Sequence, residues 1–276
     1  MRMSFLPWRE KTLRTVWKVE KSGRKSLLVG TAHFSPYSFR KQLEQLVRNA
    51  EAVLFEGPLD RESMASVARY GRNGAGTPSV YDALEPAVVR AINRHFRGQS
   101  QASTTAGAYL ELLAPKSAGF LEENARGVRP WMAFFTTWSA FLNYKHSMDV
   151  EAYRIALEMG REIGYLETIR DQLDALDGIP FERIVQYLNH FQHWDAHRKR
   201  FTRVFIEGKL DDYLSITGEF PTRCESIIGR RDPIFFRGIR ASAEQRRTTA
   251  FVGVGHVPGI LRRFADAGYH ISQEAP

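Results

Sequence analysis

Short apolar runs alternate with segments of helical periodicity along the first sixty residues. Residues 15–19 and 26–29 are rich in apolar side chains and flank a polar turn around Gly23, which predicts a β-hairpin because glycine adopts the positive φ of a tight turn. Apolar positions then recur at helical spacing over residues 43–50, and Ala52–Phe55 has the pattern of a short buried strand. A strand, a helix and a second strand in this order predict a βαβ unit with parallel strands.

The rest of the chain continues the alternation. Residues 60–147 are mainly helical in pattern, and we expect them to form a helical insertion or cap. Residues 131–144 predict a buried helix rather than a membrane span, which needs about 20 apolar residues. Further strands are expected at 163–166, 249–252 and 269–272, and a largely helical stretch at 181–214. The pattern predicts an α/β fold with a central, mainly parallel sheet and flanking helices, in one domain spanning 1–276.

Composition narrows the class of protein. The chain has 276 residues, 43% of them apolar, which is enough for a large core. Cys224 is the single cysteine, so an intramolecular disulfide and a cysteine-based zinc site are excluded. The formal net charge of +8 favours anionic partners, but the densest basic run, 197–200, lacks interleaved aromatic residues, so we expect no specific nucleic acid partner. With no signal-peptide pattern and no transmembrane segment, we expect a cytoplasmic protein.

Four apolar strands lead into a histidine or a glutamate. These are LLVGTAH ending at His33, AVLFEG containing Glu56, IGYLET containing Glu167, and AFVGVGH ending at His256. The carboxyl ends of parallel strands lie along one edge of a sheet, and ligands bind in the crevice outside that edge. The sequence therefore predicts one cleft that two imidazoles and two carboxylates share.

Such a set has two chemical uses, and the residues alone leave both open. His33, Glu56 and His256 could bind a divalent metal and leave open positions for water and substrate. Alternatively, a histidine and a glutamate could activate water directly as acid and base. A third interpretation is a protein without catalytic activity that captures a peptide or an anionic ligand in the same cleft.

The motifs Gly30-Thr-Ala-His33 and Gly253-Val-Gly-His256 resemble the paired G-x-x-H motifs of the TraB/GumN/PrgY family, which includes the Tiki proteins. The resemblance continues through the order of the segments LLVGTAHFSP, AVLFEG, SMDVEAYRIALEMGREIGYLET, RRDPIFFRGI and VGVGHVPGILRRFADAGYHI. The family resembles the erythromycin esterase and ChaN-like α/β fold, and its Tiki branch is regarded as metal-dependent proteases.

The resemblance implies that His33, Glu56 and His256 form the metal or catalytic set, with Mn²⁺, Co²⁺ or Zn²⁺ as the ion. It also implies that Glu167 and Arg231 complete the pocket, where Arg231 could hold a substrate carboxylate or stabilise developing negative charge. The chain departs from the family in having Asp232 where Asn usually follows this arginine, and in showing no membrane anchor.

On this basis we expect a metal-dependent, peptidase-like hydrolase that acts on a peptide or another small substrate. A metal-free, esterase-like hydrolase and a noncatalytic regulatory protein that binds a peptide or an anion are the alternatives.

Overall fold

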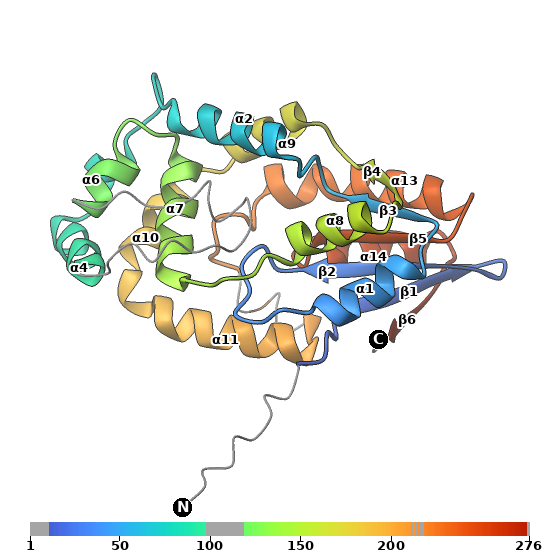
Figure 1. Cartoon of the computed structure of the whole chain (residues 1–276). Helices are drawn as coiled ribbons and strands as arrows, with labels where there is room; N and C mark the ends of the chain where they lie inside the picture. Colours follow the sequence, from blue (N-terminus) through green and yellow to red (C-terminus); the bar gives the residue numbers. More distant parts are fainter. Residues whose placement is uncertain (1–10, 98–118, 211, 213–214, 216–217, 275–276) are drawn as a thin grey trace, which may run out of the picture.

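A six-stranded sheet lies at the centre of the part of the chain that the computed structural model describes, residues 11–97, 119–210, 212, 215 and 218–274 (Figure 1). The strand order across the sheet is β4-β3-β5-β2-β1-β6. The strands are β1 (Val16–Lys21), β2 (Arg24–Thr31), β3 (Ala52–Phe55), β4 (Glu162–Tyr165), β5 (Thr248–Gly253) and β6 (His270–Glu274).

The sheet is mainly parallel, as the sequence predicts. Strands β2, β5, β3 and β4 run parallel, whereas β1 pairs antiparallel with both β2 and β6. The predicted hairpin is confirmed: β1 and β2 are joined by Ser22 and Gly23, both with positive φ. In the register of the parallel strands, Leu28 lies opposite Ala250 and Ala250 opposite Leu54. The carboxyl ends of β2, β5 and β3 therefore reach the same edge.

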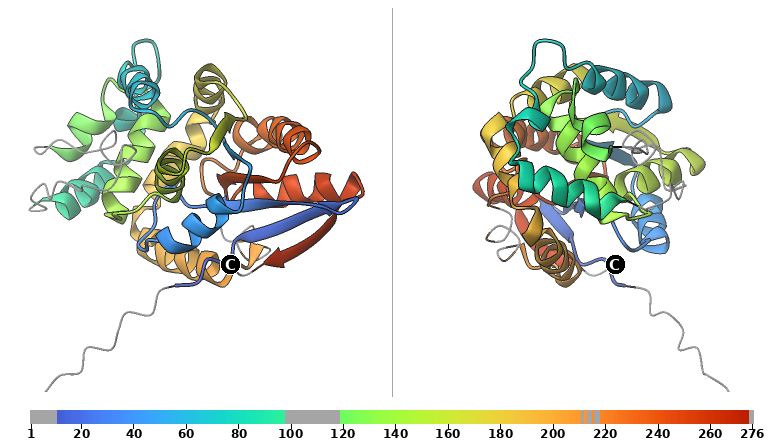
Figure 2. Two further views of the ribbon diagram at one scale, coloured as in Figure 1. Left: turned by 45° about the vertical axis from the view of Figure 1, so that its right-hand side comes forward. Right: turned by 90° about the vertical axis from the view of Figure 1, so that its left-hand side faces the viewer.

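Helices cover both faces of the sheet (Figures 1 and 2). They are α1 (Arg40–Arg48) and α8 (Met148–Glu158) on one face, and α13 (Arg231–Ala243) and α14 (Val257–Asp266) on the other. Successive residues of a strand point to opposite faces, so Phe55 packs on the α8 side and Leu54 on the α13 side. Phe55 also stacks on Phe251 of β5, with ring centroids 5.5 Å apart. The flanking helices that the sequence predicts are confirmed.

A group of helices lies beyond the carboxyl edge of the strands, with α4, α6, α7 and α10 on the left of Figure 1, α2 and α9 at the top and α11 at the bottom. It comprises α2 (Arg61–Arg72), α3 (Val80–Ala83), α4 (Pro86–Phe96), α6 (Phe120–Ala125), α7 (Pro130–Leu142), α9 (Ile169–Asp177), α10 (Phe181–Asn189) and α11 (Trp194–Glu207). Helix α7 is the predicted buried helix, and Phe134 and Trp138 sit in its aromatic core. None of the described helices is long and apolar enough to cross a membrane.

The described parts of residues 60–147 are mainly helical, while residues 98–118 lie outside the described residues. The division into one domain with an insertion stays a prediction. The described part of the helical stretch expected at 181–214, which leaves out residues 211, 213 and 214, is interrupted between α10 and α11 by a 3-10 turn, Phe191–His193. Here Trp194 turns inward and its indole N–H donates to the carbonyl of Tyr187 at 3.0 Å, a tertiary contact that periodicity does not reveal. Gly208, with φ of 68°, ends α11 as expected.

Candidate active site

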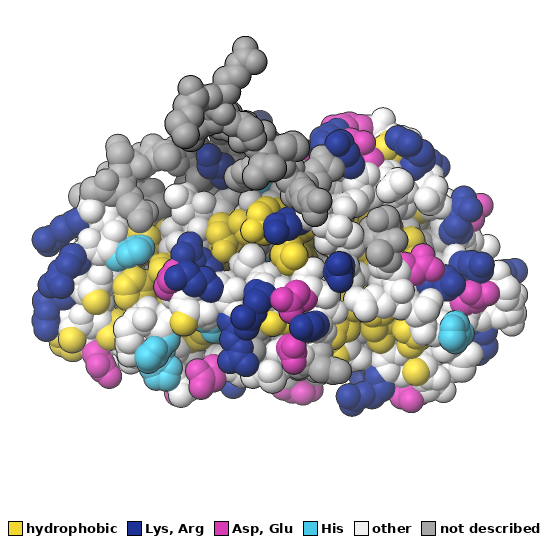
Figure 3. Space-filling view, turned by 90° about the horizontal axis from the view of Figure 1, so that it is seen from below, with side chains coloured by type: hydrophobic (Ala, Val, Ile, Leu, Met, Phe, Trp, Pro, Cys, Tyr) yellow, Lys and Arg dark blue, Asp and Glu magenta, His cyan; other side chains and the backbone are white. Residues whose placement is uncertain are grey.

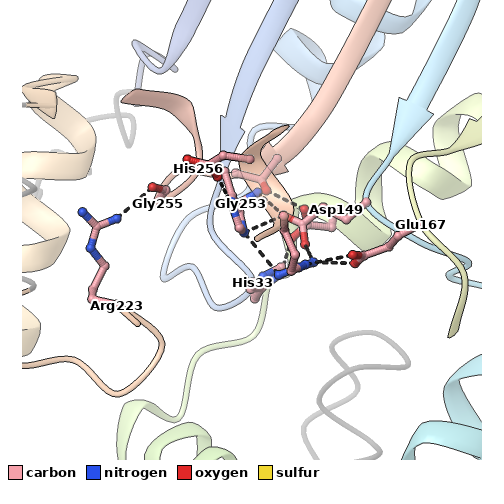
Figure 4. A network of polar contacts seen from close by, with 11 residues as sticks. His33, Asp149, Glu167, Arg223, Gly253, Gly255 and His256 are labelled. Atoms are coloured by element: carbon pink, nitrogen blue, oxygen red, sulfur yellow. Dashed lines mark hydrogen bonds and ion pairs between the residues drawn. The ribbon is translucent and has the colours of Figure 1, made fainter. Parts of the chain in front are cut away.

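The three predicted active-site residues that follow β2, β3 and β5 converge on Gly253. A Cβ atom added to this glycine would lie 3.2 Å from Glu56 Oε1, 3.5 Å from His33 Nε2 and 3.8 Å from His256 Cδ2. His33 follows β2 by two residues, Glu56 directly follows β3, and His256 follows β5 by three. Because residue 253 has no side chain, the two imidazoles and the carboxylate can approach the backbone at one point (Figure 4).

The imidazole of His33 is held by Asp149, which lies in the first turn of α8. His33 Nδ1 donates to Asp149 Oδ2 at 2.8 Å, and the hydroxyl of Thr31 donates to the other carboxylate oxygen. Burial lowers the pKa of His33, but the charge and hydrogen bond of Asp149 and the charge of Glu56 outweigh it and raise this pKa to about 9. The His33 side chain is 38% exposed, so it is a protonated group that a ligand can reach.

His256 is buried and has both ring nitrogens in hydrogen bonds. Its Nδ1 donates to Asp232 Oδ1 at 2.7 Å, and its Nε2 accepts from Arg231 Nη1 at 3.2 Å. A guanidinium cannot accept a hydrogen bond, so this pair of contacts requires a neutral imidazole with its proton on Nδ1. The ring also packs edge-on against Phe235, with centroids 5.0 Å apart. His256 is therefore fixed in one orientation and one tautomer.

Arg231 joins the two glutamates. Its Nε donates to Glu167 Oε2 at 2.9 Å, and its Nη2 donates both to Glu167 Oε1 and, at 2.7 Å, to Glu56 Oε2. Glu56 Oε1 accepts the backbone N–H of Gly253 at 2.6 Å. Burial raises the pKa of Glu56, but the charges of Arg231 and His33 and the hydrogen bond from the Gly253 N–H outweigh it and lower this pKa to about 2. Glu56 is therefore a carboxylate throughout the physiological pH range.

Carboxylates outnumber cations in this cluster. Glu56, Glu167, Asp149 and Asp232 face one guanidinium, that of Arg231, and the imidazolium of His33. Buried charges are costly unless they are paired. The floor of the site therefore favours a cationic or neutral group beside it and disfavours an additional anion.

The predicted metal ligands do not form a metal site in this arrangement. Nε2 of His256, the atom that would bind an ion, accepts a hydrogen bond from Arg231, and the same guanidinium donates to Oε2 of Glu56. Among the residues that the structure describes, no group of three or more His, Cys, Asp and Glu side chains is placed to hold an ion. The guanidinium of Arg231 stands next to two of the three predicted ligands, so the donor set as folded does not fit the implied metal.

A cleft of about 220 Å³ opens above these residues. The polar set, including His33, Glu56, Arg231 and His256, lines one end of it. Most of its remaining wall is apolar and comes from α2, α7, α11 and the segment 220–228, including Met64, Trp131, Phe135, Trp138, Phe201 and Phe220. Arg223 Nη1 donates to the carbonyl of Gly255 at 2.8 Å and ties this segment to the loop after β5 (Figure 4).

All five site residues expected from the sequence lie in this cluster, and the structure adds two more. Asp149 and Asp232 orient the two histidines, a role that sequence reasoning did not assign to them. A signal for Asp149 was available, because it stands between Met148 and Val150 at the start of an apolar helix, where an acid would be buried. Asp232 is noticeable in the sequence only as a departure from the usual asparagine.

The fold and the site together define an α/β protein with a His, Glu and Arg cluster at the carboxyl edge of a parallel sheet. The model of the TraB/PrgY/gumN family matches residues 15–273, and the chain belongs to this family. No curated protein is similar enough to the chain to count as a match. The family assignment made from the G-x-x-H motifs is therefore confirmed.

Proposed function

We propose that this protein is a hydrolase that cleaves a carbonyl-centred bond, a peptide bond in the first instance, in the cleft at Gly253. The observation that carries this proposal is the convergence of His33, Glu56 and His256 within 3.8 Å of the Cβ position of that glycine. His33 is protonated and Glu56 is ionised, and both lie at the end of an apolar cleft. General acid and base catalysis requires a proton donor and a proton acceptor placed in this way.

The pKa values of His33 and Glu56 assign the acid and the base. They are pushed apart, to about 9 and about 2, so at neutral pH His33 carries a proton and Glu56 does not. Glu56 accepts a proton from water as the water oxygen attacks the carbonyl carbon. The bond from that carbon to the leaving nitrogen or oxygen breaks, and the leaving atom takes a proton from Nε2 of His33. Proton exchange with solvent then restores both groups.

The other residues position this pair. Asp149 holds the His33 ring so that Nε2 faces Gly253. Arg231 and the Gly253 N–H together hold the Glu56 carboxylate from two sides, which preorganises it before substrate binds. His256, locked between Asp232 and Arg231, keeps the guanidinium in place.

A metal-dependent form of the same hydrolase, acting on peptides, is the second candidate. One observation favours it: both histidines donate Nδ1–H to an aspartate and direct Nε2 to the Glu56 and Arg231 side, which is how metal-binding histidines are usually held in proteins. An ion, Mn²⁺, Co²⁺ or Zn²⁺, would supply Lewis-acid activation of water. Because the ligand set does not fit as folded, we assign no step to it.

We also propose that the protein acts in the cytoplasm on a peptide or another small substrate, without a specific nucleic acid partner. The supporting observation is that the only cysteine, Cys224, is a free thiol, with its Sγ 3.3 Å from the hydroxyl of Ser226. A thiol of this kind is compatible with a reducing compartment.

The first experiment compares peptidase and esterase turnover of wild type and of His33→Ala, Glu56→Ala and His256→Ala, before and after chelation, with calorimetric titration of Mn²⁺, Co²⁺ and Zn²⁺. Turnover that survives chelation and is lost in His33→Ala and Glu56→Ala supports the metal-free hydrolase. Near-stoichiometric ion binding that all three variants lose supports the metal-dependent form. Saturable peptide binding without turnover, tolerant of Glu56→Gln but not of Arg231→Ala, would overturn both in favour of a binding protein.

A further inference from the structure

A second cavity, of about 470 Å³, opens beside the cleft and is lined largely by α11. Four of its lining side chains are cationic, namely Lys11, Arg198, Lys199 and Arg203, and Glu207 is the one acid among the described lining residues. We call this cavity the basic groove. Figure 3, seen from below, shows Lys and Arg side chains distributed over this side of the molecule with apolar side chains between them.

The basic groove shares part of its wall with the cleft. Tyr144, Arg198 and Thr202 line both cavities, and the hydroxyl oxygens of Tyr144 and Thr202 are 3.2 Å apart. These side chains form the wall that the two cavities share. The cleft and the groove are therefore neighbours, and an extended ligand that crosses this wall would contact both.

The acids near the groove are already paired. Glu207 forms an ion pair with Lys209 at 2.8 Å, and Asp195 forms one with Lys199 at 2.7 Å and another with Arg198. The hydrogen bond and charge of Lys209, with the charges of Arg203 and Arg14, lower the pKa of Glu207.

Arg198, at the boundary between the two cavities, keeps a buried Nε without a hydrogen-bond partner in the described structure. The guanidinium also lies over the ring of Phe141, 5.6 Å from its centroid. Four cationic side chains thus line a groove whose nearby acids are Glu207 and Asp195, so the groove retains an excess of positive charge.

Charge is therefore graded along the path of a ligand. The floor of the cleft carries an excess of carboxylates around Arg231, its walls are mostly apolar with Arg198 and Arg223 among them, and the groove is cationic. An anionic group would be repelled at the floor and attracted in the groove, whereas a neutral apolar segment would be accommodated between them. A ligand with one apolar and one acidic end has a single favourable orientation.

We propose that the basic groove binds the acidic residues of an extended peptide whose apolar segment lies in the cleft. This rests on the proposed function, since it assigns the substrate of the same site. A peptide strand supplies both apolar side chains and carboxylates in one chain that advances about 3.3 Å per residue. A membrane surface fits less well, because apolar side chains that line the cleft, such as Met64, Trp131 and Trp138, are buried.

The test uses two fluorescein-labelled, amidated octapeptides, Gly-Phe-Leu-Phe-Ala followed by three Asp or by three Asn. Their binding to the full chain is measured by fluorescence anisotropy at low salt and at about 0.15 M salt, where charges more than about 8 Å apart are screened. The groove variant is Lys199→Glu with Arg203→Glu. The matched control is Arg200→Glu with Arg263→Glu, which makes the same charge change at exposed positions that do not line the groove.

We expect wild type and control to bind the Asp peptide about tenfold more tightly than the Asn peptide, a difference of about 1.4 kcal/mol. In the groove variant this preference should disappear, while the Asn peptide binds as before. Equal binding of both peptides by wild type, or an equal loss in the control, would overturn the proposal. An oligothymidylate that binds as tightly as the Asp peptide and loses affinity in the groove variant would assign the groove to nucleic acid instead.

Mass spectrometry of the unlabelled peptides separates this proposal from the proposed function. Selective binding of the Asp peptide without cleavage would refute the hydrolase and leave the groove assignment standing. Cleavage of the Asp and Asn peptides at equal rates would support the hydrolase and refute the groove assignment.

Discussion

Asp149 accepts the Nδ1 proton of His33 at 2.8 Å although the two residues are 116 positions apart in the chain. The contact forms because the end of β2 and the start of α8 lie at the same edge of the sheet. There the hydroxyl of Thr31 also donates a hydrogen bond to the Asp149 carboxylate. It makes His33 a strongly basic imidazole and, in the proposed mechanism, the general acid. Substitutions in this contact and in the cluster around it therefore test the mechanism directly.

Asp149→Asn should shift the pH profile of turnover. Removing the carboxylate charge lowers the pKa of His33 from about 9 toward its ordinary value, so the decline of activity at high pH should begin at lower pH. NMR titration of the His33 ring and the pH dependence of kcat measure this. The control, Glu151→Gln, makes the same isosteric change in α8 at a residue that bonds Ser38, and should leave both profiles unchanged. A pH profile that does not move in Asp149→Asn would remove His33 from the acid role.

The same pKa predicts how stability depends on pH. The pKa of His33 is raised from 6.5 to about 9 on folding, so its contribution to the free energy of unfolding is complete below pH 6.5 and is lost as the pH rises through 9. Urea unfolding of wild type and of His33→Gln at intervals from pH 6 to 10 measures the difference. Wild type should lose more stability than His33→Gln over this range, and parallel curves would contradict the prediction.

Glu56 should make the free energy of unfolding depend on pH in the opposite sense, with stability lost at low pH. Its pKa is lowered from 4.5 to about 2, so its contribution is complete above pH 4.5 and is lost as the pH falls through 2. Unfolding of wild type and of Glu56→Gln between pH 5 and 2 tests this, with wild type expected to lose the more stability.

Gly253→Ala should impair catalysis more than stability. The new methyl would lie 3.2 Å from Glu56 Oε1, which is tight enough to shift this carboxylate, and in ordinary contact with His33 Nε2 at 3.5 Å. Because it would also fill the space between the two reacting groups, kcat should fall by roughly tenfold to a hundredfold. Gly255→Ala is the matched control, because its methyl would meet Arg223 and Ile228 only at 3.4 and 3.6 Å. Steady-state kinetics with thermal melting distinguishes the two effects. Equal activity of the two variants would show that the convergence at Gly253 is not the reacting centre.

Arg231→Met should be strongly destabilising. It would leave the carboxylates of Glu56 and Glu167 buried and without their shared partner, at a cost of about 3–5 kcal/mol. Arg230→Met, one residue earlier and exposed, should change the free energy of unfolding by less than about 0.5 kcal/mol. Urea denaturation measures both. A loss in Arg231→Met as small as in Arg230→Met would mean that Arg231 does not hold the two glutamates together.

The sequence by itself determined the strands and the residues at their carboxyl ends. Buried strands are short, uninterrupted apolar runs, and the residue after such a run lies at the carboxyl edge, so His33, Glu56, Glu167 and His256 were predicted to share a cleft before any contact was known. The family was inferred from the two G-x-x-H motifs and is confirmed.

Only the tertiary structure decided the strand order and the partners of each site residue. Asp149 reaches His33, and Arg231 stands between Glu56, Glu167 and His256, through hydrogen bonds that join distant segments. The hydrophobic pattern of the sequence does not predict such contacts, because it indicates which face of an element is buried and not which side chain packs against it. For that reason the sequence could suggest three metal ligands, whereas the fold placed a guanidinium next to two of them.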